Sequence, residues 1–252
     1  MPRSIIAPAL FLCPLALVVA HAHADIAQFY TDPLQFQNQA SGSGKNMKGL
    51  EDFEYANVPQ GAKLAFPNSL QNGVPAPGLP AGINSDNLII QTNITPTPCP
   101  ATTNPSNNQN ALWINGAGFI GSNSIKVGTD EFLYNLFSSL DLIFTSGDKT
   151  AIGLEVSTYA GFAQGHQGFI VCAYDTNNVP IGNFLMPAAA PEPNKNFIGV
   201  WSPVPIGRVN VWGIFDVPQP FAVDDIQMWT VPSPGVLGAF GLAGMIAGRR
   251  RR

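Results

Sequence analysis

Charged side chains are scarce in this 252-residue chain: Asp, Glu, Lys and Arg make up 11% of it, against roughly a quarter of an average soluble domain. Glycine (25) and proline (23) interrupt it too often for long helices, which excludes a coiled coil or helical bundle. Five of the twelve basic residues lie at the two ends, so seven basic residues face sixteen acidic ones in the interior. Such a surface repels phosphate, and we exclude nucleic acid as a partner.

Side chains that commonly carry catalysis are also scarce. His21 and His23 lie in an N-terminal segment that export would remove, which leaves His166, in a glycine-rich turn. One remaining histidine cannot supply the several ligands of a zinc site, and no nucleophile motif accompanies it. Gly116–Gly121 matches a dinucleotide-binding glycine pattern, but the residues that follow do not predict the helix which that site requires. We therefore predict no catalytic residue and no cofactor of these kinds.

Residues 1–24 have the three parts of a secretory signal peptide. A basic start at Arg3 is followed by an apolar run over residues 5–20 and by small residues at Ala22 and Ala24. The run is shorter than the about twenty residues that a membrane span needs. We predict export and cleavage after Ala24 by signal peptidase; an uncleaved N-terminal anchor is the alternative.

The last segment, residues 231–252, also has three parts. A proline motif is followed by a glycine-rich apolar stretch over residues 235–248, which is a marginal membrane span. A basic cluster closes the chain, and the positive-inside rule keeps it on the cytoplasmic side during a transient insertion into the inner membrane. The motif consists of Pro232, Ser233 and Pro234, and the cluster of Arg249, Arg250, Arg251 and Arg252.

This segment resembles the PEP-CTERM sorting signal of exported bacterial proteins, with Ser233 where the family usually has Glu. The resemblance implies recognition by an exosortase-like sorting enzyme, which is thought to cleave near the proline motif. It also implies a place in the cell envelope, at the surface or in the extracellular matrix. A plain tail anchor is the alternative.

Residues 25–230 are predicted to form one all-β domain, an antiparallel β-sandwich of the jelly-roll type with one short N-terminal helix. Asp32-Pro33 is typical of a helix start, and we expect Leu34, Phe36 and Ala40 to face inward. Later segments are rich in β-branched and aromatic residues between turn residues, which predicts strands. These segments are 111–114, 151–156, 169–174, 179–185, 197–201, 208–212 and 221–229.

Two stretches, residues 71–87 and 92–110, are rich in proline or in Thr, Pro and Asn, which predicts loops. Either is a candidate binding loop, although a solvated connection is the simpler interpretation. Cys99 lies in the second stretch and Cys172 in a predicted strand. An exported protein with two remaining cysteines permits one disulfide between them. The alternative is a buried free Cys172 and an exposed Cys99.

Acidic residues cluster at both ends of the predicted domain, in Glu51–Glu54 and at Asp224 and Asp225. Neighbouring carboxylates repel each other unless they are hydrated, hydrogen-bonded or bridged by a cation, and calcium takes six to eight oxygen ligands. The first and last strands of a jelly roll lie close together, so the clusters could meet. Because side chains alternate along a strand, we expect one of each adjacent pair to reach a shared site.

The two clusters resemble the acidic motifs of jelly-roll carbohydrate-binding modules, in which a structural calcium ties the ends of the domain together. The resemblance implies Glu51 or Glu54 and Asp225 as ligands, with Asp52 and Asp224 as alternates. Solvated acidic strand ends remain the alternative.

Three functional hypotheses follow. The first is a non-enzymatic surface or matrix protein, associated with extracellular polysaccharide. The second is a calcium-stabilised carbohydrate-binding module, with tryptophans as sugar-stacking faces in place of core residues. The third is a secreted glycan hydrolase that uses a pair of the clustered carboxylates. The tryptophans are Trp113, Trp201, Trp212 and Trp229, and the carboxylates are Glu51, Glu54, Asp224 and Asp225.

Overall fold

The structure is a computed structural model. It describes residues 26–95, 97–104, 111–116, 124–127, 139–158, 168–187, 195–214 and 221–231. The predicted cleavage site at Ala24, the motif at 232–234, the cluster at 249–252 and His166 lie outside these ranges. Within them, no helix combines the length and the apolar character that crossing a membrane requires.

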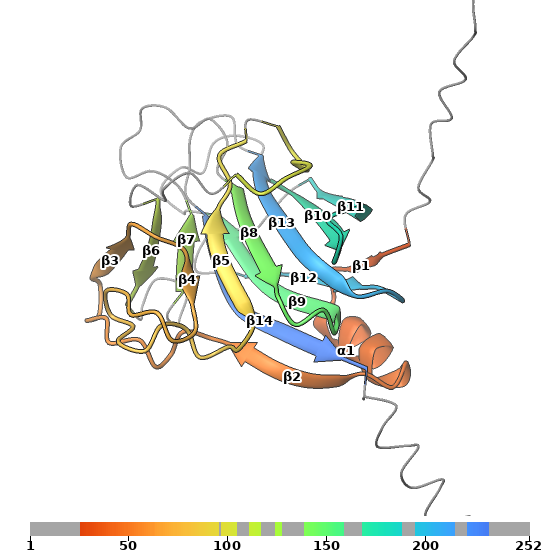
Figure 1. Ribbon diagram of the computed structural model, residues 1–252, viewed down its shortest axis with the longest axis horizontal. Helices are drawn as coiled ribbons and strands as arrows, with labels where there is room; N and C mark the ends of the chain where they lie inside the picture. Colours follow the sequence, from red (N-terminus) through yellow and green to blue (C-terminus); the bar gives the residue numbers. More distant parts are fainter. Residues whose placement is uncertain are drawn as a thin grey trace, which may run out of the picture.

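The described residues contain fourteen strands and one helix. The strands form two antiparallel sheets packed face to face (Figure 1). Sheet A contains, in spatial order, β1 (Gln28–Tyr30), β12 (Asn196–Trp201), β9 (Lys149–Thr158), β14 (Phe221–Thr230), β7 (Ser124–Val127), β6 (Leu112–Asn115) and β3 (Lys63–Phe66), and β2 (Asn46–Glu51) also pairs with β14. Sheet B contains β11 (Pro180–Met186), β10 (Gly168–Asp175), β13 (Ile206–Ile214), β8 (Ser139–Phe144), β5 (Leu88–Thr92) and β4 (Leu70–Gln71).

The strand order is that of a jelly roll. From β8 to β14 the chain alternates between the sheets, apart from the hairpin of β10 and β11. This places β8, β13, β10 and β11 side by side in sheet B and β14, β9 and β12 side by side in sheet A. The last strand, β14, pairs with β7 near its start and with β2 near its end. The predicted antiparallel β-sandwich of the jelly-roll type is confirmed.

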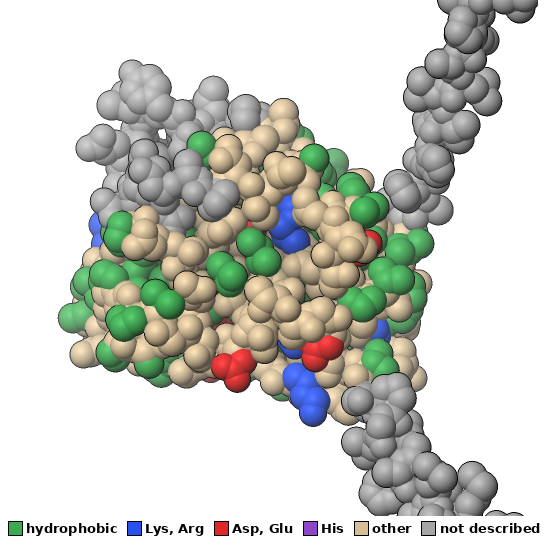
Figure 2. All heavy atoms as spheres, viewed as in Figure 1, with side chains coloured by type: hydrophobic (Ala, Val, Ile, Leu, Met, Phe, Trp, Pro, Cys, Tyr) green, Lys and Arg blue, Asp and Glu red, His purple; other side chains and the backbone are tan. Residues whose placement is uncertain are grey.

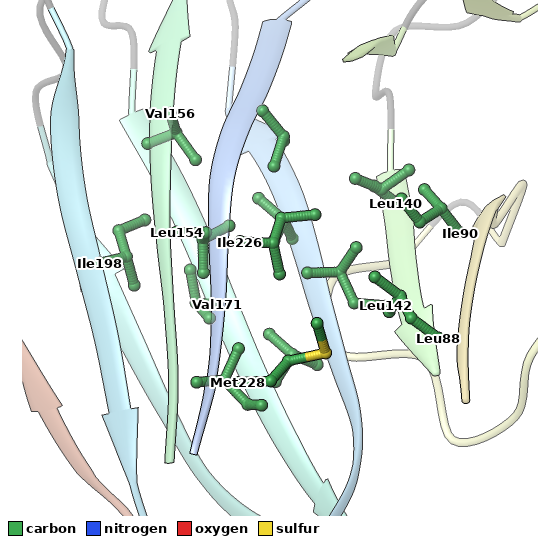
Figure 3. Close-up of a cluster of buried hydrophobic side chains, with 14 of the residues drawn as sticks. Leu88, Ile90, Leu140, Leu142, Leu154, Val156, Val171, Ile198, Ile226 and Met228 are labelled. Atoms are coloured by element: carbon green, nitrogen blue, oxygen red, sulfur yellow. The ribbon is translucent and has the colours of Figure 1, made fainter. Parts of the chain in front are cut away.

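Apolar side chains from the two sheets meet in the space between them (Figure 3). Leu154, Ile198 and Ile226 come from sheet A, and Leu88 and Leu142 come from sheet B; all five are at most 1% exposed. Full burial of one such side chain contributes about 1.5–3 kcal/mol to stability. Because successive side chains of a strand point to opposite faces of its sheet, the apolar residues at every second position determine which face packs inward.

The predicted N-terminal helix is α1 (Pro33–Gly42). The Asp32 carboxylate caps it by accepting hydrogen bonds from the backbone N–H groups of the next turn, and Pro33 occupies the first helical turn. Phe36 and Ala40 are fully buried, as expected. Leu34 is 68% exposed, so the prediction that it faces inward was wrong. Phe36 and Ala40 are four residues apart on one helical face, and Leu34 lies on another.

Helix α1 packs against sheet A at a point where two glycines pair. Gly153 and Gly199 are direct cross-strand partners on β9 and β12. A Cβ atom at Gly199 would lie 2.5 Å from a ring carbon of Phe36, and one at Gly153 would lie 2.9 Å from the same ring. The two glycines thus leave room for the Phe36 ring, which also packs against Phe197 at 5.3 Å between centroids.

Candidate functional site

Glu51, a predicted calcium ligand, lies at the end of β2 opposite Ile226 of β14 and is fully buried. Its Oε1 atom accepts a hydrogen bond of 2.5 Å from the Tyr55 hydroxyl. Its Oε2 atom accepts one of 2.9 Å from the backbone N–H of Ser85. Tyr55 in turn accepts a hydrogen bond of 2.8 Å from the backbone N–H of Asn84. Glu51 and Tyr55 therefore fix the turn that precedes β5.

The hydrogen bond between Tyr55 and Glu51 keeps its direction over a wide pH range. Burial raises the pKa of Tyr55 well above its ordinary value, and the hydrogen bond and negative charge of Glu51 add to this effect. The phenol consequently remains a donor. Glu54, the other candidate of this cluster, is exposed, and its backbone N–H donates to the Asp52 carboxylate at 3.2 Å.

The second acidic cluster surrounds a lysine. The Nζ atom of Lys195 lies 2.7 Å from Glu155, 3.3 Å from Asp224 and 3.4 Å from Asp225, measured to carboxylate oxygens. Burial acts to lower the pKa of Lys195, but the hydrogen bond and charge of Glu155 and the charges of both aspartates raise it overall. The lysine thus carries the positive charge that these carboxylates need.

A β-bulge lets both aspartates reach the same ammonium group. Asp224 pairs with Glu155 and Gln227 pairs with Gly153, so β14 holds one residue more than β9 between these pairs. Asp225 adopts a φ of 47°, in the left-handed region. The expectation that strand alternation allows one of the two aspartates to face a shared site was therefore wrong, because the bulge breaks the alternation.

The predicted calcium ligands do not form one donor set. Glu51 uses its oxygens for Tyr55 and Ser85, whereas Asp225 contacts Lys195. In the part of the chain that the structure describes, no group of three or more His, Cys, Asp or Glu residues is arranged to hold a metal ion. These residues do not fit a shared calcium site, and calcium binding stays a prediction for experiment.

Cys99 and Cys172 form a disulfide, with 5.4 Å between their Cα atoms. The bond joins the outer face of sheet B to the loop of residues 93–95 and 97–104, named the sheet B loop below. The two cysteines are 73 residues apart in sequence. In the chain-entropy model a closed loop of this length contributes about 4 kcal/mol to stability.

Buried polar contacts hold the same loop. The Arg208 guanidinium, 3% exposed, donates to the Asp141 carboxylate at 3.0 Å, the Pro100 carbonyl at 2.8 Å and the Asn178 side chain at 2.8 Å. It also lies 3.6 Å from the centre of the Tyr174 ring. The sequence predicted a solvated connection here, because no local pattern shows that Arg208 and Asp141 meet beneath it.

Asp141 is surrounded by donors. Besides Arg208, Asn210 donates to it at 2.9 Å and Asn93 at 2.7 Å. Because a buried carboxylate is tolerated when it is paired and hydrogen-bonded, this cluster stabilises the loop on the sheet. The Asp141 carboxylate and the Arg208 guanidinium are thus paired within the protein.

A polar cleft of about 240 Å³ opens where the two sheets meet near β2. One wall is β2 and the other is the turn Asn84–Asn87, named the cleft turn below; β9 and β14 contribute one residue each. Figure 2 shows basic and acidic side chains next to one another along the edge where Figure 1 places β2 and the end of β14. The lining residues are Lys48, Gly49, Leu50, Asn84, Ser85, Asp86, Asn87, Lys149 and Met228.

The cleft turn is anchored from behind. Besides the bonds from Glu51 and Tyr55, the Asn72 side chain donates to the Asn84 carbonyl at 3.3 Å. The Asn87 carbonyl accepts from the Thr145 backbone N–H at 2.9 Å. Asn87 has a φ of 63°, a left-handed conformation that asparagine adopts more readily than most residues. These contacts use backbone groups of the turn, and Asn84 and Asn87 are exposed and line the cleft.

The two lysines of the cleft differ. Lys149 is 7% exposed, and its ammonium donates to Asp148 at 2.6 Å and to Ser146 at 3.0 Å. Partial burial of Asp148 opposes its ionisation, but the hydrogen bonds from Lys149 and Ser146 lower its pKa overall. Lys48 is exposed and forms no ion pair with any described residue. One cation of the cleft is therefore compensated and the other is not.

The tryptophans do not line this cleft. Trp113 and Trp212 are at most 5% exposed. Trp201 and Trp229 are half-buried and pack against the cluster around Phe36 beneath α1. The four rings thus serve the interior of the domain and the seat of the helix.

Comparisons with known proteins concern the fold. No family model and no curated protein matches the chain. Among solved structures, the chain is similar to the CBM22-1 xylan-binding domain of Paenibacillus barcinonensis Xyn10C, with 14% identity over 75% of this chain and 97% of that one and a TM-score of 0.35. It is also similar to a family 29 carbohydrate-binding module complexed with cellulohexaose (9% identity, 67% and 91% covered, TM-score 0.33). A third similar structure is a mannan-recognising module (8%, 48% and 80%, TM-score 0.34). Similarity at these identities carries nothing about the ligand of this chain.

Proposed function

We propose that the protein is a non-catalytic, exported surface or matrix protein whose β-sandwich binds polysaccharide in the cleft between β2 and the cleft turn. The observation that carries this proposal is a pre-formed cleft lined by four exposed polar residues, Lys48, Asn84, Asp86 and Asn87. Sugar hydroxyl groups both donate and accept hydrogen bonds, and a ligand site usually pairs a few placed polar groups with apolar contact area.

The lining meets both needs. The amides of Asn84 and Asn87 donate and accept, Lys48 donates, and Asp86 accepts. Leu50, which is 43% exposed, offers apolar area to the C–H face of a sugar ring. The cleft is smaller than the roughly 300–1,000 Å³ of a typical small-molecule pocket, which suits a short portion of a polymer that runs past it.

Anchoring of the cleft turn supports binding. Ordering a loop upon binding subtracts from affinity, and a wall that is already held avoids that loss. Glu51 and Tyr55 hold the backbone of Asn84 and Ser85 at 2.8 to 2.9 Å. Glu51 thus acts in this proposal as a positioning residue.

The acidic groups support a binding role over hydrolysis. Glycoside hydrolysis requires two carboxyl groups that face one cleft about 5–10 Å apart. Among the described residues that line the cleft, Asp86 supplies the one carboxylate. Glu51, Asp224 and Asp225 are engaged by Tyr55, Ser85 and Lys195.

The proposed location rests on the two ends of the sequence. Signal peptidase would cleave after Ala24, and an exosortase-like enzyme would process the chain near Pro232–Pro234, with Arg249–Arg252 held in the cytoplasm. The mass of the protein recovered from a bacterial host tests this directly. Loss of both ends supports sorting, and retention of both ends contradicts it.

Affinity electrophoresis through gels that contain neutral or acidic polysaccharides tests binding. We expect retardation of the wild-type protein by at least one polysaccharide and its loss in the Asn84→Ala/Asn87→Gly variant. Glycine at position 87 keeps the left-handed backbone while it removes the amide. Asn177→Gly, in the hairpin turn between β10 and β11, is the matched control. Equal mobility in all gels, or retardation unchanged in the double variant, contradicts the proposal.

A further inference from the structure

The balance of charge sets the cleft apart from the rest of the protein. The interior of the sequence holds seven basic against sixteen acidic residues. Among the described residues that line the cleft are two of those seven basic residues, Lys48 and Lys149, and one carboxylate, Asp86. With Asp148, which pairs with Lys149, basic and acidic groups balance there, whereas acidic residues are in excess in the interior as a whole.

The two lysines contribute differently to that balance. Lys149 is fixed by Asp148 and Ser146, so its ammonium is positioned and largely compensated. Lys48 lies on β2, is exposed, and has no anionic partner among the described residues. Lys48 is therefore free to pair with a charge that the ligand brings.

From this arrangement, and resting on the proposed function, we infer that the cleft selects anionic polysaccharides, in which a carboxylate or sulfate on a sugar unit meets Lys48 and the amides of Asn84 and Asn87 hold neighbouring hydroxyl groups. A neutral sugar hydroxyl would accept a hydrogen bond from the Lys48 ammonium but would leave its charge without a counter-ion. An anionic group adds the attraction of an ion pair to that hydrogen bond.

The carboxylate of Asp86 opposes this selectivity. It lines the same cleft, is exposed, and carries the same sign as the ligand. Removing its charge should therefore strengthen the binding of an anionic glycan, whereas removing the charge of Lys48 should weaken it. If the two substitutions change the affinity for an anionic glycan in opposite directions, the cleft selects ligands by charge and not by hydrogen bonding alone.

Titration calorimetry of the protein with tetragalacturonate, a sulfated oligosaccharide, cellotetraose and xylotetraose tests the inference. We expect one of the anionic ligands to bind about tenfold more tightly than the neutral ones at about 0.02 M salt, with the difference reduced at about 0.3 M salt by screening. Lys48→Gln should weaken anionic binding about fivefold and neutral binding less, because the glutamine amide still donates a hydrogen bond to a hydroxyl group. Asp86→Asn should strengthen anionic binding. Lys63→Gln, on β3 at the far edge of sheet A, is the charge-matched control.

Each outcome of these measurements supports or overturns the inference. Equal affinity for neutral and anionic ligands, or an unchanged Lys48→Gln variant, overturns the anionic selectivity and leaves polysaccharide binding in place. Equal losses in Lys48→Gln and Lys63→Gln reduce the effect to net charge and also overturn it. No binding of any of the four ligands overturns the proposed function together with the inference. The carboxylated and sulfated arms then show which anionic group is preferred.

Discussion

Two polar loops of this protein, the cleft turn and the sheet B loop, are held by a buried carboxylate each and yet end in opposite states. Glu51 anchors the cleft turn through backbone N–H groups and the hydroxyl of Tyr55, which leaves the side chains of the turn open to solvent. Asp141 pairs with Arg208, which donates to the Pro100 carbonyl of the sheet B loop, and accepts a hydrogen bond from the Asn93 side chain of that loop. Glu51 and Tyr55 hold the cleft turn through its backbone groups and leave its side chains for a ligand, whereas Asp141 also engages a side chain of its loop.

The largest effect should come from the closed loop. In Asp141→Ala the Arg208 guanidinium remains buried without its carboxylate, which costs about 3–5 kcal/mol in the free energy of unfolding. Urea unfolding measures this loss. The Asp141→Leu/Arg208→Met variant removes both charges and should lose less than Asp141→Ala. Equal losses in the two variants would show that the charge pair is not the cause.

Opening the disulfide should have the next largest effect. Reduction, or the Cys99→Ala/Cys172→Ala variant, should lower the free energy of unfolding by about 4 kcal/mol, less any strain in the native bond. Urea unfolding with and without reductant measures the loss, and the double variant should no longer respond to reductant. Alkylation of two thiols in the unreduced protein would contradict the bond.

Disturbing the anchor of the open turn should separate binding from stability. In Glu51→Gln one accepting oxygen becomes an NH2 group, which donates and cannot accept, so either Tyr55 or Ser85 loses its acceptor. The buried group left unpaired costs about 1–3 kcal/mol. Because the turn is then held less well, glycan affinity should fall as well. Asp225→Asn alters an acidic residue outside the cleft lining and should leave affinity unchanged. Equal affinity losses in the two variants would remove the positioning role of Glu51.

A smaller, pH-dependent effect is expected at Lys45, which is 4% exposed and donates to the carbonyls of Thr150 and Ser202 near the ring of Trp201. Burial lowers the pKa of Lys45 from 10.5 to about 8. Between these values the unfolded chain binds more protons than the folded chain, so the contribution of Lys45 to stability rises with pH.

The difference in unfolding free energy between wild type and Lys45→Met should therefore move in favour of wild type from pH 8 to pH 10. Thermal or urea unfolding across that window measures it, with Lys48→Met as an exposed control. A difference that stays constant with pH contradicts the shift.

The smallest effect is expected from chelation. Because Glu51 and Asp225 do not share a donor set, a chelator should leave the melting temperature within error. Calcium that binds the folded protein alone must raise the midpoint. A calcium-dependent rise would thus restore the site that the sequence predicted and would revise the geometry described above.

Much of the fold could be predicted because its determinants are local. Asp32 and Pro33 indicate the start of α1, and apolar segments between turn residues indicate β9 to β14 to within two or three residues. The closeness of β2 and β14 followed from jelly-roll topology. Leu34 was misplaced because it lies two residues before Phe36, about 200° away around the helix, and so cannot share the face of Phe36 and Ala40.

The candidate site could not be predicted, because its parts are distant in sequence. The cleft joins Lys48, the cleft turn, Lys149 and Met228, and no spacing pattern relates them. The bulge at Asp225 likewise depends on how β14 meets β9. The sequence predicted Glu51 as a calcium ligand. In the structure its carboxylate accepts hydrogen bonds from Tyr55 and Ser85, which the fold brings to it.

The pairing of β14 with β2, β7 and β9 also governs when this chain can fold. Contacts that join the first and last strands form late and slow the folding of a domain. Sheet A cannot close until Thr230 has been synthesised, so the chain stays open during nearly all of its synthesis. A protein proposed to be exported therefore stays unfolded, as passage through a membrane requires, for most of the time it spends on the ribosome.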